Sequence, residues 1–189
     1  MTGRPAIVND TYFATRTHDE GDELDLAPQP PVVDYATITT CLRPTARSLL
    51  RLTDYWRSKR AGGAMPDREA IDPTEIIVHL PWLFMADVIE GGADYRYRLL
   101  GTSIVSANYR DATGRSFQDL YGAEATKLQG ARLGFDLALS RREPVYTQGR
   151  AFWRPDWTYD RFEAAFLPLS ADGSTVNIIL GEIAYLRPL

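Results

Sequence analysis

Residues that could carry nucleophilic or metal chemistry are scarce in this chain. It contains one cysteine, Cys41, and two histidines, His18 and His79. A nucleophilic serine or cysteine needs a base beside it, and the sequence has neither a GxSxG elbow nor a cysteine with a plausible histidine partner. The glycine pairs at 62–63 and 91–92 have turn spacing and match no phosphate-binding motif. We therefore predict that the protein is not an enzyme.

Aromatic residues are the richest chemical feature, and they indicate a ligand pocket. Such a pocket forms where aromatic walls leave room and a few polar groups converge. Tyr97, Tyr109 and Tyr146 join apolar rings to hydroxyls that could orient a polar ligand. The same side chains could instead fill the core, which would make the protein a ligand-free interaction adaptor. The residues that we predict to line the pocket are Tyr97, Leu99, Tyr109, Phe117, Phe135, Tyr146, Phe152 and Phe166.

Strands and helices in a particular order must position these residues. Apolar runs at 83–89 and 95–100 predict an antiparallel hairpin, and helical spacing over 124–141 predicts a helix that Pro144 closes. Three strands should follow at 145–153, 159–169 and 176–186, the last two joined by a turn with Asp172-Gly173. This order favours an α+β fold with an antiparallel sheet and helices gathered on one face.

A basic amphipathic helix is expected before this sheet, at about residues 43–60. Six basic residues and one acidic residue, Asp54, lie in this segment. In the simpler interpretation, the apolar stripe of this helix packs on the core and its arginines are exposed to water. We instead expect an interface with a second copy or another protein, because the apolar surface exceeds what one stripe requires. The interface residues are predicted to be Leu49, Leu52, Tyr55 and Trp56.

Charge is distributed unevenly along the 189 residues. Residues 1–34 hold seven acidic and two basic residues together with a proline cluster at 28–31, which predicts an acidic, mostly disordered tail. The net charge of −4 argues against nucleic-acid binding by the chain as a whole. No apolar run is long enough for a membrane span, and no signal peptide is visible at the start. A single cysteine fits a reducing compartment, so we expect a cytoplasmic protein.

Several sequence blocks follow one another in a fixed order. They are 95–102 (YRYRLLGT), 113–117 (TGRSF), 142–145 (REPV) and 167–173 (LPLSADG), preceded by 52–60 and 71–88. Together they resemble blocks of a PAS-like family of single-domain proteins of alphaproteobacteria. The resemblance implies a five-stranded antiparallel sheet cupped by helices around a small pocket, with a role in sensing. We divide the chain into the tail at 1–34, a leading amphipathic helix at 35–63 and a PAS-like domain at 64–189. Leading helices in such domains often pair with a second copy.

Cofactors of known PAS branches can be compared with the residues present. Flavin photoreceptors carry a reactive cysteine after the second strand, and residues 102–125 contain none. Haem-binding relatives use a histidine of the long helix, and residues 123–143 contain none. His79 is interpreted as a histidine favoured by a helix end. We expect no covalent flavin and no haem; the cofactor, if any, is unknown, and a small-molecule ligand that signals through protein contact is the leading hypothesis.

Overall fold

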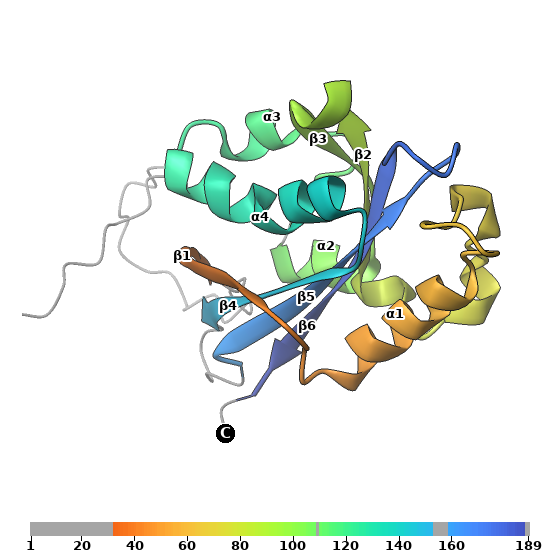
Figure 1. The fold of residues 1–189 in the computed structure, drawn as a ribbon. Helices are drawn as coiled ribbons and strands as arrows, with labels where there is room; N and C mark the ends of the chain where they lie inside the picture. Colours follow the sequence, from red (N-terminus) through yellow and green to blue (C-terminus); the bar gives the residue numbers. More distant parts are fainter. Residues whose placement is uncertain (1–31, 109, 153–158, 188–189) are drawn as a thin grey trace, which may run out of the picture.

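The fold is organised around one antiparallel sheet (Figure 1). A computed structural model describes residues 32–108, 110–152 and 159–187. The strands are β1 (Val32–Cys41), β2 (Leu83–Ile89), β3 (Asp94–Leu100), β4 (Val145–Phe152), β5 (Arg161–Leu169) and β6 (Ile178–Leu186). Their order across the sheet is β1-β4-β5-β6-β2-β3, and all neighbours pair antiparallel. The predicted α+β class is confirmed, but the described part of the chain forms six strands and not five.

The additional strand is β1, which pairs with β4 at the edge of the sheet. The predicted boundary between the tail (1–34) and the leading helix (35–63) falls within this strand. Its sequence, VVDYATITTC, is rich in valine, threonine and isoleucine. These β-branched side chains favour extended backbone over helix. Residues 35–41 therefore belong to a strand and not to the predicted leading helix.

Three helices cover the face of the sheet that will be called the pocket face. They are α2 (Thr102–Asn108), α3 (Phe117–Tyr121) and α4 (Ala125–Arg141). The predicted long helix over 124–141 is therefore confirmed as α4. Gly134 lets α4 lie close to the sheet, because a Cβ atom at this position would overlap the ring of Phe166 in β5. Short 3-10 turns complete the structure at Arg68–Ala70, Pro73–Ile76, Leu80–Trp82 and Glu90–Gly92.

The helix α1 (Arg47–Ser58) lies on the opposite face of the sheet, across β5 and β6. Side chains alternate along a strand, so Phe162 and Phe166 of β5 face α4 while Glu163 between them faces α1. The helices predicted to gather on one face are α2, α3 and α4, whereas α1, which was expected to precede the sheet, lies on the other face.

The apolar stripe of α1 is buried within its own chain. Leu49 and Leu52 are fully buried, and the buried Trp56 donates a hydrogen bond from Nε1 to the carbonyl of Pro168 at 2.9 Å. The half-buried Tyr55 accepts a hydrogen bond from the backbone N–H of Asp72 at 2.8 Å. Of the four residues predicted to form an interface, Leu49, Leu52 and Trp56 are buried in the core of their own chain, and an interface at the half-buried Tyr55 stays a prediction. The arginines of the helix are exposed, as expected for a helix whose apolar stripe packs on the core.

Candidate functional site

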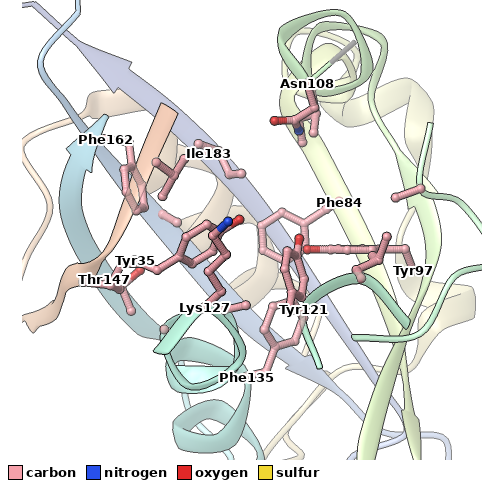
Figure 2. Close-up of a pocket in the computed structure, with 18 of the residues that line it drawn as sticks. Tyr35, Phe84, Tyr97, Asn108, Tyr121, Lys127, Phe135, Thr147, Phe162 and Ile183 are labelled. Atoms are coloured by element: carbon pink, nitrogen blue, oxygen red, sulfur yellow. The ribbon is translucent and has the colours of Figure 1, made fainter. Parts of the chain in front are cut away.

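A cavity of about 330 Å³ lies between the pocket face of the sheet and helices α2, α3 and α4 (Figure 2). Each strand of the sheet contributes at least one side chain to its wall, and so does each of the three helices. The lining residues are Val33, Tyr35, Ile38, Phe84, Tyr97, Leu100, Ile104, Asn108, Arg110, Ala112, Leu120, Tyr121, Glu124, Lys127, Gly130, Ala131, Phe135, Thr147, Phe162, Ala164, Phe166, Ile183 and Tyr185.

Three phenylalanines from different elements form one apolar wall. The ring centroids of Phe84 and Phe135 are 5.5 Å apart, and those of Phe135 and Phe166 are 5.0 Å apart. Phe84 and Phe166 close the triangle at 5.4 Å. These separations are typical of tilted and edge-on aromatic packing, which holds the rings in fixed orientations. The wall is therefore preformed, and it offers ring surfaces to whatever enters the cavity.

Tyrosine hydroxyls gather at another part of the cavity. Tyr121 of α3 lies beside Tyr35 of β1, with ring centroids 5.7 Å apart, and Tyr97 of β3 lines the same cavity. Burial raises the pKa of Tyr35 and Tyr97 well above the ordinary tyrosine value, and the neighbouring Tyr121 hydroxyl adds to this effect. Burial likewise raises the pKa of Tyr185 to about 12. These hydroxyls keep their protons at neutral pH, so they remain hydrogen-bond donors.

Charged and amide side chains lie where helices α2 and α4 meet the cavity. The Nζ atom of Lys127 is 2.9 Å from Oε1 of Glu124, the N-cap residue of α4. Lys127 is the more buried partner, with 26% of its side chain exposed against 46% for Glu124. Figure 2 shows the lysine side chain running into the cavity beside Tyr35, while Asn108 approaches from α2. The cavity thus joins an apolar wall to a limited number of polar groups.

Three of the residues predicted to line the pocket do line this cavity: Tyr97, Phe135 and Phe166. Phe117 is fully buried behind them, with its ring centroid 4.9 Å from that of Tyr97. Tyr146 faces the other way, and its hydroxyl donates to Oγ1 of Thr53 in α1 at 3.0 Å. Tyr109 and the side chain of Phe152 lie outside the described residues. Ligand binding by the lining residues stays a prediction.

Leu99 does not reach the cavity, because the strand pairing shifts beside it. Met85 of β2 pairs with Leu99, whereas the next residue, Ala86, pairs with Tyr97. Arg98 is therefore an extra residue, and it reverses the alternation of side chains that follow it. Leu100 lines the cavity instead, and Leu99 is 41% exposed on the other side. The bulge corrects the prediction that Leu99 lines the pocket together with Tyr97.

The residues that the sequence analysis missed come mainly from β1, α3 and α4. Tyr35 was overlooked because β1 was not predicted, although its β-branched composition was a usable signal. Tyr121 and Lys127 were overlooked because a short helix and an exposed-looking lysine give no sign that they face a cavity. Thr147, the residue after Tyr146, lines the cavity. The prediction therefore chose the correct strand, β4, but the wrong face of it.

A buried histidine–carboxylate pair lies on the face that α1 covers. Nδ1 of His79 is 2.7 Å from Oε2 of Glu182 in β6, and both side chains are buried. We had interpreted His79 as a histidine at a helix end, whereas its ring is held by this carboxylate. Ile183, the neighbour of Glu182, lines the cavity, so the pair lies on the opposite side of the sheet from the cavity. The pair is therefore shielded from molecules in the pocket.

Two features are absent from the described residues. Within residues 32–108, 110–152 and 159–187, no group of three or more histidine, cysteine, aspartate or glutamate side chains is arranged to hold a metal ion. In the same part of the chain, no helix has the length and apolar character needed to cross a membrane.

Comparison with known proteins identifies the fold family. A profile of the PAS domain family matches residues 45–184, which include α1 and the strands β2 to β5. The match begins after β1, so this additional strand lies outside it. No curated protein and no solved structure matches the chain significantly. The match covers well over half of the sequence, and the chain belongs to the PAS domain family.

Proposed function

We propose that this chain is a sensor or regulatory PAS module that binds a small molecule in the cavity and signals through contact with another protein. The observation that carries the proposal is the preformed cavity of about 330 Å³, in which phenylalanine rings and tyrosine hydroxyls converge. Its volume falls at the lower end of the range for ligand pockets, which is roughly 300–1,000 Å³. Such a site suits a compact molecule with one or two rings.

The strand β1 supports the signalling part of the proposal. Val33, Tyr35 and Ile38 of β1 line the cavity, so a bound molecule would contact this strand directly. The pairing of β1 with β4 is interrupted between Asp34 and Thr39, so fewer ladder hydrogen bonds hold this edge strand than a regular pairing would supply. A ligand that packs against β1 would strengthen its attachment, and a protein partner could detect that difference.

A thermal unfolding experiment with a small-molecule extract of the protein's own host tests the proposal. The Ala131→Phe variant places a ring in the cavity, because Ala131 of α4 lines it. Ala125→Phe is the matched control, since Ala125 is an exposed residue of the same helix. The extract should raise the Tm of the wild type and the control by about 5 °C or more if the ligand is in excess. The Ala131→Phe variant should show no increase.

Two results would contradict the proposal. The extract could leave the wild-type Tm unchanged, which would favour an adaptor without a ligand. It could also stabilise the wild type and Ala131→Phe equally, which would place the binding site elsewhere on the protein.

A further inference from the structure

A trio of tyrosines, Tyr35, Tyr97 and Tyr121, lines the cavity, and the ring centroids of Tyr35 and Tyr121 are 5.7 Å apart. Each tyrosine carries one hydroxyl proton. Burial raises the pKa of Tyr35 and Tyr97 well above the ordinary value, so these hydroxyls are hydrogen-bond donors at neutral pH. A ligand that fits this end of the cavity should present an oxygen that accepts a hydrogen bond.

The charged residues that line the cavity favour an anionic acceptor. Among the described lining residues they comprise two cations, Arg110 and Lys127, and one carboxylate, Glu124. Glu124 is the more exposed partner of the pair with Lys127, and Figure 2 shows the lysine side chain extending into the cavity. A negatively charged group on the ligand would be attracted by these two cations. Hydrogen bonds to a charged acceptor are also about twice as strong as those between neutral groups.

The remaining wall limits the rest of the ligand. Phe84, Phe135 and Phe166 hold their ring centroids 5.0 to 5.5 Å apart and present an apolar, aromatic surface. A planar ring packs on such a surface with better geometry than a flexible alkyl chain, which also loses more conformational freedom on binding. The cavity volume of about 330 Å³ sets the size to that of a small molecule.

From these three features we infer that the pocket binds a small aromatic monocarboxylate. The aromatic ring packs against the phenylalanine wall, and the carboxylate lies between the tyrosine trio and the ammonium group of Lys127. This inference rests on the proposed function and specifies the chemical class of its ligand.

Calorimetric titration with three probes of similar size tests the ligand class. Cinnamate has both the ring and the carboxylate, cinnamyl alcohol lacks the charge, and octanoate lacks the ring. We expect cinnamate to bind at least about tenfold more tightly than either of the other two, because each lacks one of the matched interactions. Equal affinity for cinnamate and cinnamyl alcohol would overturn the assignment of a carboxylate. Equal affinity for cinnamate and octanoate would overturn the assignment of an aromatic ring.

Substitutions separate the polar contacts from general effects on the fold. Lys127→Met should weaken cinnamate binding by about tenfold and leave binding of cinnamyl alcohol unchanged, because only the acid carries the charge. Tyr97→Phe should also weaken cinnamate binding. Tyr146→Phe is the matched control: it removes a buried hydroxyl on the face that α1 covers, so cinnamate affinity should not change. Loss of affinity in the control, or none in Lys127→Met, would contradict the inferred position of the carboxylate.

The titration and the extract experiment fail in distinguishable ways. If no carboxylate binds but the host extract still stabilises the wild type and not Ala131→Phe, the ligand class is overturned and the proposed function stands. If neither the carboxylates nor the extract has an effect, both are overturned.

Discussion

The carboxylate of Glu163 accepts two hydrogen bonds from Thr45, which lies 118 positions earlier in the sequence. The backbone N–H of Thr45 donates at 2.8 Å and its hydroxyl at 2.9 Å, and the N–H of Ala46 adds a third bond at 2.9 Å. Glu163 is the third residue of β5, and Ala46 is the N-cap residue of α1. The side chain of Ala46 cannot accept a hydrogen bond from the free N–H groups at the start of the helix. The carboxylate of Glu163 from the sheet accepts hydrogen bonds at this helix end instead.

This relationship predicts that Glu163 fixes α1 to the sheet. Glu163→Ala leaves three donors without their acceptor, and the free energy of unfolding should fall by about 3 kcal/mol. Glu163→Gln should cost less, because an amide oxygen still accepts a hydrogen bond. Urea unfolding measures both effects, with Glu143→Ala at an exposed position as the control. A change below about 0.5 kcal/mol for Glu163→Ala, the size expected at the exposed control, would show that the cap has no energetic role.

Gly134 predicts an unusual response to alanine. In the interior of a helix this substitution ordinarily increases stability by up to about 1 kcal/mol. Here the new Cβ atom would overlap the ring of Phe166, and overpacking of a core costs roughly 1–3 kcal/mol. Gly134→Ala should therefore lower the free energy of unfolding, and Phe166→Leu in the same chain should relieve part of that loss. Additive losses in the double variant would rule out the contact as the cause.

The raised tyrosine pKa values predict a loss of stability in alkali. The pKa of Tyr185 is raised by burial to about 12, and those of Tyr35 and Tyr97 are raised as well. In the unfolded chain a tyrosine ionises near pH 10. Above about pH 10 the unfolded state loses protons that the folded state retains, so the free energy of unfolding is unaffected below this pH and falls as pH rises further.

Urea unfolding at about pH 8, 10 and 11 measures this loss, together with the ultraviolet absorbance of ionised tyrosine. Tyr97→Phe should reduce the slope, because one raised group is removed. Constant stability from about pH 8 to 11 would contradict burial of these hydroxyls.

Two truncations separate β1 from the residues before it. Removal of residues 1–31 leaves every described element intact, and the Tm should change by less than about 2 °C. Removal of residues 1–41 deletes β1 and exposes the edge of β4, so the Tm should fall by about 5 °C or more. Ligand binding should also be lost, because Val33, Tyr35 and Ile38 leave the cavity wall. Unchanged binding after removal of 1–41 would exclude β1 from the site.

The elements with strong local patterns were predictable from sequence. The long helix and the last five strands follow from apolar periodicity, and the alternation of side chains placed Tyr97 and Phe166 on the pocket face. Leu99 was misplaced because a one-residue bulge at Arg98 leaves no clear sequence signal.

Features that depend on tertiary packing could not be predicted in this way. The stripe of α1 appeared too wide for a core, because the sheet surface that buries Leu52 and Trp56 is formed by residues more than 100 positions away. The buried carboxylates of Glu163 and Glu182 have partners that are equally distant in sequence. A single sequence gives the composition of such contacts but not their pairing.

Native mass spectrometry of protein purified from its own host tests the central claim most directly. The account predicts that the wild type carries a bound small molecule, that Ala125→Phe retains it, and that Ala131→Phe, which fills the cavity, does not. A wild-type protein that shows only the mass of its polypeptide, or an Ala131→Phe variant that keeps the same added mass, would contradict a ligand in this pocket.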